Sequence, residues 1–438
     1  MAKKEQEFKL EFSGKETVTA KSGLGLYGEL YKSSGVYGDV KRLFPEPGSG
    51  NGYEAHWHIY PTVLTILDGG EHIEDVRKIG CDKGLRKIGH IEEAPSPDAV
   101  GNWLKRGSGK KAEILYEIND NLNSKIIRCI ENDLTLDIDA FEIIGEKGSA
   151  EVNYKGNKGY MPMAGFIPEA GCCVGYEFRE GSEPPAARNY EFIKGIVEKV
   201  KGYGKRIKAV RSDSAAYISD VFNYAHGEGV RYAITVDHDM AVKEGIKNIS
   251  KSEWKKLNGH KGFENSGREY AEFVHSMNKT NHSFRVVVQR WVNPHRDLFE
   301  DTEEYCYHGI ATDYLEEEKD SVEVIKWHNG RSNSENYDKE LKSGFGLRHV
   351  PCDDFGGNSV WFGLAIVAYN LFIASKVFLF PKSWVKKTIG RIRYEFIHMA
   401  GKVLYRSRQL TLRICSALKE TYEIYVEARQ RCRELAFL

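Results

Sequence analysis

The chain has 438 residues, 41% of them hydrophobic, with 24 Tyr and 20 Phe but only 12 Pro. This composition supplies apolar material for two or three domains and excludes an intrinsically disordered protein. Lys and Arg balance Asp and Glu, so the net charge of zero gives no overall sign of nucleic-acid binding.

The start of the chain and its cysteines predict a cytoplasmic protein. The segment "MAKKEQEFKLEFSGKE" is charged where a secretory signal would be apolar. No C-x-x-C pair and no zinc-type spacing with His is present, which indicates reduced, buried thiols. The eight cysteines are at positions 81, 129, 172, 173, 306, 352, 415 and 432.

Residues 1–125 combine short helix-like apolar patches with glycine-rich breaks, so this region is predicted to be mainly helical. The segment "GLGLYG" (23–28) matches a dinucleotide-binding fingerprint. No strand precedes it and no βαβ unit follows, which excludes that interpretation. The segment 96–106 begins with Ser-Pro and predicts a helix.

From about residue 130 the pattern alternates between strands and helices. β-Forming residues and turn signals mark the strands, and apolar residues at helical spacing mark the helices. This order predicts a mixed sheet covered by helices, an α/β fold. The predicted elements are strands 133–144, 158–167 and 172–181, helix 189–204, strand 207–213, helix 214–229 and strand 230–237.

Residues 238–305 interrupt this alternation and predict an inserted β-rich subdomain. It contains Trp254, Trp291 and the β-forming run 283–292. After it, the apolar segment 360–380 is long enough to cross a membrane, but it contains Asn370, Ser375 and Lys376, so a buried core helix is favoured.

Residues 381–438 predict a basic helical tail. They hold 13 Lys or Arg and five Glu, an excess of eight positive charges. This excess is typical of a surface that binds phosphates, and a solvated amphipathic tail is the alternative.

A polar segment, "HNGRSNSENYDKELK" (328–342), predicts a helix with one carboxylate among cations. At about 100° per residue, His328, Arg331, Glu335 and Lys342 fall at roughly 0°, 300°, 340° and 320°, on one narrow face. The simplest interpretation is a solvated face with an Arg331–Glu335 ion pair worth a few tenths of a kcal/mol.

Three aspartates lie in or at the ends of predicted strands. Asp213 ends one strand just before a helix, where α/β sheets often place their chemistry; a capping role is the alternative. Asp137 and Asp139 alternate with Leu136 and Ile138, so both aspartates share one face of their strand. Carboxylates of this kind, with Glu335, are ligands that Mg²⁺ prefers, and two such ions can clamp a phosphoryl transfer.

Three blocks of the chain resemble the catalytic blocks of DDE transposases of bacterial insertion sequences. They are "TLDIDAFEIIGEKGSAEVNYKGNKGYMPM", "VRSDSAAY" and "HNGRSNSENYDKELKSGFGLRHVPCDDFGGNSVWFGLAIVAYNL". The third block is similar to the Tyr-x2-Arg-x3-Glu-x6-Lys signature of one subgroup. With "YPTVLTILDGGEHIEDVRKI" and "EAPSPDAVGNWL" nearer the start, the chain most resembles the insertion-sequence family numbered thirteen-eighty.

The resemblance implies an RNase H-like catalytic core with a β-rich insertion. The implied regions are a DNA-end-binding and assembly region (1–125), the core (126–237), the insertion (238–305), the rest of the core (306–380) and the basic tail (381–438). The resemblance also assigns a metal-binding triad of Asp139, Asp213 and Glu335, with Arg331 and Lys342 as the signature cations.

Two positions depart from the family pattern. His328 stands where the family has Tyr; either side chain can donate to phosphate, but His would add pH dependence. Asp139 is followed by Ala140, as in the family, but then by Phe141 instead of the usual Thr. Asp137 therefore remains the rival of Asp139 as the first metal ligand.

The function implied is Mg²⁺-dependent cleavage at insertion-sequence ends and strand transfer into target DNA, cut-and-paste DNA recombination by an endonuclease. Two Mg²⁺ ions are expected, with Mn²⁺ as a possible substitute. The expected partners are terminal inverted repeats, target DNA and a second copy of the chain, in a prokaryotic cytoplasm at the nucleoid. In related enzymes a flipped base stacks on an aromatic residue; Trp291 or Trp254 could do so, although a core role is favoured for both.

Two other functions fit parts of the sequence. A domesticated DNA-binding protein would keep the basic tail but lose the chemistry, and the intact triad argues against it. A metal-free hydrolase with two carboxylates would not need Arg331 and Lys342 beside its glutamate.

Overall fold

The computed structural model describes residues 10, 14, 16–48, 52–294, 304–414 and 419–435, without the side chains of 332–335. The chain forms two compact units. The central unit is residues 101–377, and the terminal unit combines residues 1–100 with 378–438. The N-terminal and C-terminal regions, expected to be separate, thus form one unit, and residues 101–125 belong to the other.

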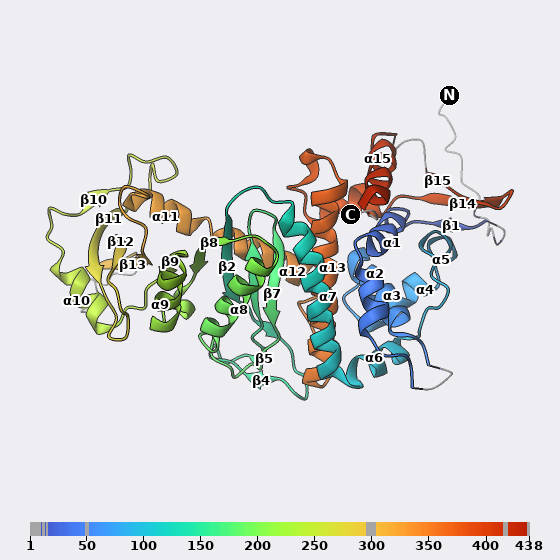
Figure 1. Cartoon of the computed structure of the whole chain (residues 1–438), viewed down its shortest axis with the longest axis horizontal. Helices are drawn as coiled ribbons and strands as arrows, with labels where there is room; N and C mark the ends of the chain where they lie inside the picture. Colours follow the sequence, from blue (N-terminus) through green and yellow to red (C-terminus); the bar gives the residue numbers. More distant parts are fainter. Residues whose placement is uncertain are drawn as a thin grey trace, which may run out of the picture. The chain divides into compact units, whose positions relative to one another are not determined.

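A nine-stranded mixed sheet organises the central unit (Figure 1). Strand β2 is parallel to β8, and β8 is parallel to β9, whereas β6 is antiparallel to both of its neighbours, β2 and β7. The predicted mixed sheet is therefore confirmed. In spatial order the strands are β10 (Lys255–Lys256), β11 (Glu269–His275), β12 (Phe284–Val292), β13 (Tyr305–Thr312), β9 (Arg231–Thr235), β8 (Ile207–Ser212), β2 (Leu134–Ala140), β6 (Met163–Ile167) and β7 (Cys172–Glu177).

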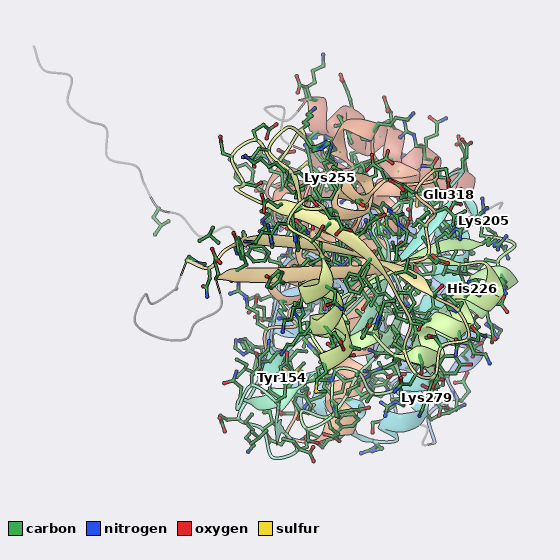
Figure 2. The ribbon with its side chains drawn as sticks, turned by 90° about the vertical axis from the view of Figure 1, so that its left-hand side faces the viewer. Tyr154, Lys205, His226, Lys255, Lys279 and Glu318 are labelled. Atoms are coloured by element: carbon green, nitrogen blue, oxygen red, sulfur yellow. The ribbon has the colours of Figure 1, made fainter. Side chains whose placement is uncertain are left out.

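The strands of the expected insertion extend this sheet instead of forming a separate one. Strand β13 pairs with β9 through Ile310 and Thr235, and β12, β11 and β10 follow outward. The outermost strand, β10, consists of Lys255 and Lys256. Lys255 is labelled on the surface in Figure 2, and two exposed lysines on an edge strand discourage further strand pairing.

Helices cover both faces of the sheet. A Cβ added at Gly165 of β6 would meet Ile196 and Phe192 of α8 as well as Leu136 of β2, so α8 covers the face of Leu136. Phe166 is the next residue of β6 and points to the opposite face of the sheet. Its ring centroid lies 5.1 Å from that of Tyr337 of α12. The helices are α7 (Ser108–Arg128), α8 (Asn189–Gly202), α9 (Ser219–Glu228), α10 (Met240–Asn248), α11 (Ser321–Asn329), α12 (Ser332–Gly344) and α13 (Phe355–Ala374). A small sheet of β3 (Ile143–Ile144), β5 (Lys158–Tyr160) and β4 (Glu151–Val152) follows β2.

The long apolar helix α13 is a core helix. The stretch Phe355–Leu379 is long and apolar enough to cross a membrane, but 83% of its most apolar window is buried within the protein. Asn370 on this helix donates to Asn119 of α7 and both donates to and accepts from the backbone of Cys173 in β7. These bonds explain a polar residue in an apolar helix, because they satisfy an amide that is otherwise costly to bury.

The terminal unit joins the two ends of the sequence in one fold. Arg393 donates to the backbone carbonyls of Leu67 and Ile66 at 2.8 and 2.9 Å, and Arg429 forms an ion pair with Glu29. The expected helical tail also contains a β-hairpin, which the sequence analysis missed. The elements are β1 (Val18–Thr19), α1 (Leu24–Ser33), α2 (Val36–Leu43), α3 (Ala55–Asp68), α4 (Val76–Gly80), α5 (Lys83–Gly89), α14 (Ile389–Ile392), β14 (Gly401–Arg406), β15 (Gln409–Ile414) and α15 (Lys419–Leu435). Helix α6 (Pro97–Lys105), predicted from its Ser-Pro start, includes the boundary between the units.

The cysteines are free thiols in the described part of the chain, but burial is not general. Cys172, Cys173, Cys352 and Cys432 are buried, whereas Cys81 and Cys129 are exposed. Cys306 is half-buried, and Cys415 lies outside the described residues.

Candidate active site

Two aspartates lie at the carboxyl ends of adjacent parallel strands, β2 and β8. The register of β2 and β8 pairs Asp137 with Arg211. Asp139 lies two residues further along β2, and Asp213 directly follows the last residue of β8. Because side chains alternate, Asp139 points to the same face of β2 as Asp137. The topology thus brings together two residues that are distant in sequence.

Asp137 is buried and fully engaged by an arginine. Nε and Nη2 of Arg211 donate to its two carboxylate oxygens at 2.7 and 2.8 Å, and its exposed fraction is 0%. Burial raises the pKa of Asp137, and the guanidinium opposes that rise. A bidentate pair of this kind satisfies the carboxylate. Asp137 is thereby a structural partner of Arg211, and Asp139 is the better placed of the two candidate ligands.

Asp139 lies nearer the surface and contacts a signature cation. Its side chain is 15% exposed, and Nη1 of Arg331 donates to Oδ2 at 3.3 Å. Arg331 stands immediately before α12. Arg331, predicted as a signature cation, thus lies beside Asp139.

Asp213 is the N-cap of a short 3₁₀ turn, Ser214–Ala216, that precedes α9. Its Oδ1 accepts from the backbone N–H of Ala215 at 3.0 Å and from Ser212 Oγ at 3.3 Å. Within the described residues both bonds use Oδ1, and no hydrogen bond to Oδ2 is found among them. The capping and ligand interpretations are thus compatible, because they use different oxygens.

The segment 328–342 is two helices and not the single helix predicted. Helix α11 ends at Asn329, and α12 begins at Ser332. A Cβ added at Gly330 would lie 2.7 Å from Nη1 of Arg211, which also donates to the Trp327 carbonyl at 2.7 Å. Glycine at this break leaves room for the guanidinium that holds Asp137. The predicted common face of four side chains is correspondingly interrupted.

His328 is buried, so the expected phosphate contact at this position is corrected. It is 4% exposed, and its Nε2 lies 3.2 Å from Thr235 Oγ1 and 3.3 Å from the Ser212 carbonyl oxygen. Burial, reinforced by His308 and Arg331, lowers the pKa of His328 to about 3. The imidazole is neutral near pH 7 and joins the ends of β8 and β9 to α11.

This neutral histidine predicts acid sensitivity. A group whose pKa is lowered by folding stabilises the protein at pH values above the ordinary pKa of that group. This contribution is lost as the pH falls from the ordinary pKa toward the folded-state pKa. Between about pH 7.5 and pH 5, wild type should lose about 2 kcal/mol more unfolding free energy than His328→Gln. Urea denaturation at both pH values measures the difference, with the exposed His226→Gln as control. Equal losses in wild type and His328→Gln would contradict the prediction.

Glu335 and Lys342 both lie on α12. The side chain of Glu335 lies outside the described part of the structure. Nζ of Lys342 lies 5.3 Å from the ring centroid of Phe141. Phe141 directly follows β2, the strand that carries Asp139. Although burial acts to raise the pKa of the adjacent Glu142, hydrogen bonds from Asn157 and Asn153 lower it.

The two tryptophans of the expected insertion are only half-buried, which corrects the expectation of core residues. Arg290 lies 4.0 Å from the ring centroid of Trp254, and Arg268 lies 4.5 Å from that of Trp291. Both rings are therefore already covered by a guanidinium.

Among the described side chains, no group of three or more His, Cys, Asp or Glu is arranged to hold a metal ion. That set includes Asp139 and Asp213 but not Glu335. The donor chemistry of the two aspartates fits a hard divalent cation, since both offer carboxylate oxygens at one sheet edge.

Sequence reasoning missed Arg211, which organises the site. The signal was present: an arginine in an apolar strand must find an anion, and Asp137 is the buried aspartate on the neighbouring predicted strand. Pairing Arg211 with Asp137 requires the register of their two strands. The residue pattern of neither strand alone gives that register.

The model of the transposase DDE domain group 1 family matches residues 1–436. The chain belongs to this transposase family. The Tyr-Arg-Glu-Lys subgroup and the thirteen-eighty insertion-sequence family remain predictions.

No curated protein matches this transposase. Among solved structures, it is similar to a piggyBac transposase whose synaptic complex with hairpin DNA was determined by cryo-EM. The identity is 11% and the TM-score 0.43, over 93% of this chain and 78% of that chain.

Proposed function

We propose that this transposase cleaves the ends of an insertion sequence by metal-dependent phosphoryl transfer and joins the freed 3′-OH to target DNA. The proposal is supported by the positions of Asp139 and Asp213 at the carboxyl ends of the adjacent parallel strands β2 and β8, with Arg331 beside Asp139. The strand order β7-β6-β2-β8-β9, in which only β6 is antiparallel to the other four strands, supports an RNase H-like catalytic core.

Asp139, Asp213 and Glu335 would hold the metal, which we propose to be two Mg²⁺ ions, replaceable by Mn²⁺. Bound there, such ions activate the attacking oxygen and neutralise the charge that develops on the phosphate. The unengaged Oδ2 of Asp213 and the accessible carboxylate of Asp139 support this assignment. Asp137 is excluded from it because both its oxygens bind Arg211.

The protein's own task is to position DNA phosphate beside the carboxylates. Arg331 and Lys342 carry fixed positive charge at the two ends of the helix that bears Glu335. Arginine and lysine at such positions neutralise phosphate and orient it, and no covalent enzyme intermediate is needed. Because an insertion sequence has two ends, two protomers on paired ends are proposed, in a closed two-fold assembly. The setting would be the prokaryotic nucleoid.

A plasmid that carries the gene with its flanking DNA tests the proposal. With Mg²⁺, the purified protein should release a linear fragment bounded by inverted repeats, and chelation by EDTA should stop the reaction. Absence of cleavage with both Mg²⁺ and Mn²⁺ would contradict the proposed function. Sequencing of the released ends would define the terminal repeats.

A further inference from the structure

The hairpin formed by β14 and β15 has an unusual charge composition. Residues 401–414, here called the basic hairpin, contain four cationic side chains and no Asp or Glu. Its turn is exposed together with Tyr405, which has 68% of its surface accessible. The cations are Lys402, Arg406, Arg408 and Arg413.

The two faces of the basic hairpin differ. Leu410, Leu412 and Ile414 alternate along β15 and, with Tyr425 of α15, line a cavity of about 430 Å³ within the terminal unit. The other face carries the cross-strand pairs Lys402–Arg413 and Arg406–Gln409. The apolar side is thus turned toward its own unit and the cationic side away from it.

The cations are largely uncompensated. Lys402 forms an ion pair with Glu16. In the described part of the chain, Arg406, Arg408 and Arg413 make no ion pair. Like charges directly across a strand pair, as at Lys402 and Arg413, destabilise a hairpin. Three arginines without an ion pair on one small hairpin fit an anionic partner.

The turn adds a second, independent sign. Ser407 and Arg408 have φ angles of 50° and 65°, both in the left-handed region. A two-residue hairpin turn of this kind favours Asn-Gly, because other residues are strained by about 1–2 kcal/mol each. Here a cation occupies the strained position at the tip. Strain kept at an exposed position favours a binding role.

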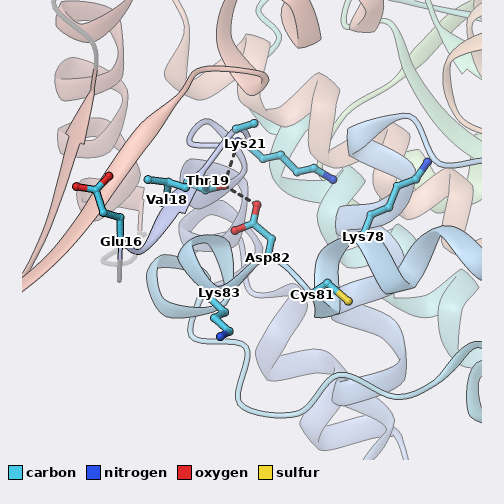
Figure 3. A pocket seen from close by; sticks show the side chains of 9 residues that line it. Glu16, Val18, Thr19, Lys21, Lys78, Cys81, Asp82 and Lys83 are labelled. Atoms are coloured by element: carbon cyan, nitrogen blue, oxygen red, sulfur yellow. Dashed lines mark hydrogen bonds between the residues drawn. The ribbon is translucent and has the colours of Figure 1, made fainter. Parts of the chain in front are cut away.

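The base of the basic hairpin is firmly held. Strand β1 pairs with β14 through Val18–Lys402 and Thr19–Gly401. Thr19 donates to Asp82 at 2.7 Å, as Figure 3 shows, at one side of a pocket of about 520 Å³. A Cβ added at Gly84 would lie 2.5 Å from the Val18 carbonyl oxygen, so α5 packs directly on β1.

We infer that the basic hairpin binds duplex DNA, with its cationic face and tip on the phosphate backbone. A two-stranded ribbon fits the major groove of B-DNA, and three unpaired arginines supply contacts that do not depend on base sequence. The inference deepens the proposed function by naming a DNA-gripping surface remote in sequence from Asp139 and Asp213. It also assigns this binding to one element of the predicted basic tail.

The full chain in EDTA, which prevents cleavage, tests the inference with a fluorescent random duplex of about 40 base pairs at roughly 0.05–0.3 M salt. Arg406→Gln, Arg408→Gln and Arg413→Gln together should lower the slope of log affinity against log salt by about 2–3, because each lost phosphate contact removes about 0.9. At about 0.1 M salt this corresponds to roughly 10²-fold weaker binding. A triple variant on and just after α10, Lys243→Gln, Lys247→Gln and Lys251→Gln, is the matched control, since these lysines are also exposed, and it should keep both slope and affinity.

Two single variants separate charge from turn geometry. Ser407→Asn relieves strain and keeps the cation, so binding should be unchanged. Arg408→Gly relieves strain and removes the cation, so the protein should be at least as stable as wild type but lose about one unit of slope. An unchanged slope in the hairpin triple variant, or an equal loss in the control triple, would overturn the inference. Failure of wild type to bind any duplex would instead overturn the proposed DNA substrate.

Discussion

Asp139→Asn and Asp213→Asn should each abolish Mg²⁺-dependent DNA cleavage while leaving folding and DNA binding intact. Loss of a group that merely supports a metal ligand costs about 10–100-fold, so loss of a ligand should exceed about 10²-fold. Asn keeps the shape of the side chain and, at position 213, an oxygen that can still accept from Ala215. Glu335→Gln should behave in the same way. The measurement is the rate of end cleavage on the plasmid described above.

Asp133→Asn is the matched control for this series. Asp133 precedes β2 at the end remote from the site, and its side chain is 79% exposed. It should cleave at the wild-type rate. A readout independent of activity is thermal unfolding with and without Mg²⁺, since a bound ion stabilises the folded state. Mg²⁺ should raise the unfolding temperature of wild type and Asp133→Asn, but not that of Asp139→Asn. Retained cleavage in Asp139→Asn would remove it from the proposed triad.

Asp137→Ala should destabilise the central unit by about 3–5 kcal/mol, because it leaves the buried guanidinium of Arg211 without its anion. Asp139→Ala removes a partly exposed pair and should cost about 1 kcal/mol or less. Urea denaturation measures the difference, and hydrogen exchange should show the loss in β2 and β8.

A double variant gives a second test of the Asp137–Arg211 ion pair. Asp137→Leu with Arg211→Met replaces the ion pair by apolar side chains and should recover much of the stability lost in Asp137→Ala. If Asp137→Ala instead remains as stable as wild type and loses cleavage, Asp137 takes the place of Asp139 as metal ligand. The two aspartates, two residues apart, are thus separated by stability as well as by rate.

The site could be predicted from the sequence as far as local patterns reach. Period-2 alternation placed Asp137 and Asp139 on one face, and the strand-to-helix change placed Asp213 at a sheet edge. Which aspartate is engaged by Arg211 depends on a pairing across 74 residues, and the pattern of either strand alone carries no information about it. His328 was misassigned for the same reason, because its burial arises from Ser212 and Thr235 on two other strands.

The fold was predicted best where the chain alternates regularly between strands and helices, as in residues 130–237. The hairpin at 401–414 was missed because its turn, Ser407–Arg408, lacks the glycine or asparagine that marks such turns. The strands β10 to β13 were recognised as β-rich, but their continuation of the central sheet depends on β13 pairing with β9. The split of α11 from α12 follows from Gly330 and the space that Arg211 needs.

The terminal unit has a consequence for the order of synthesis. Its first 100 residues share the unit with residues 378–438, and the ion pair between Arg429 and Glu29 spans 400 positions. On a translating ribosome, the first segment therefore emerges long before β14 and α15 exist. A nascent or prematurely terminated polypeptide can contain all of residues 101–377 and still lack β14 and β15. The basic hairpin can therefore form only when translation is nearly complete, and a chain that ends before residue 401 lacks it.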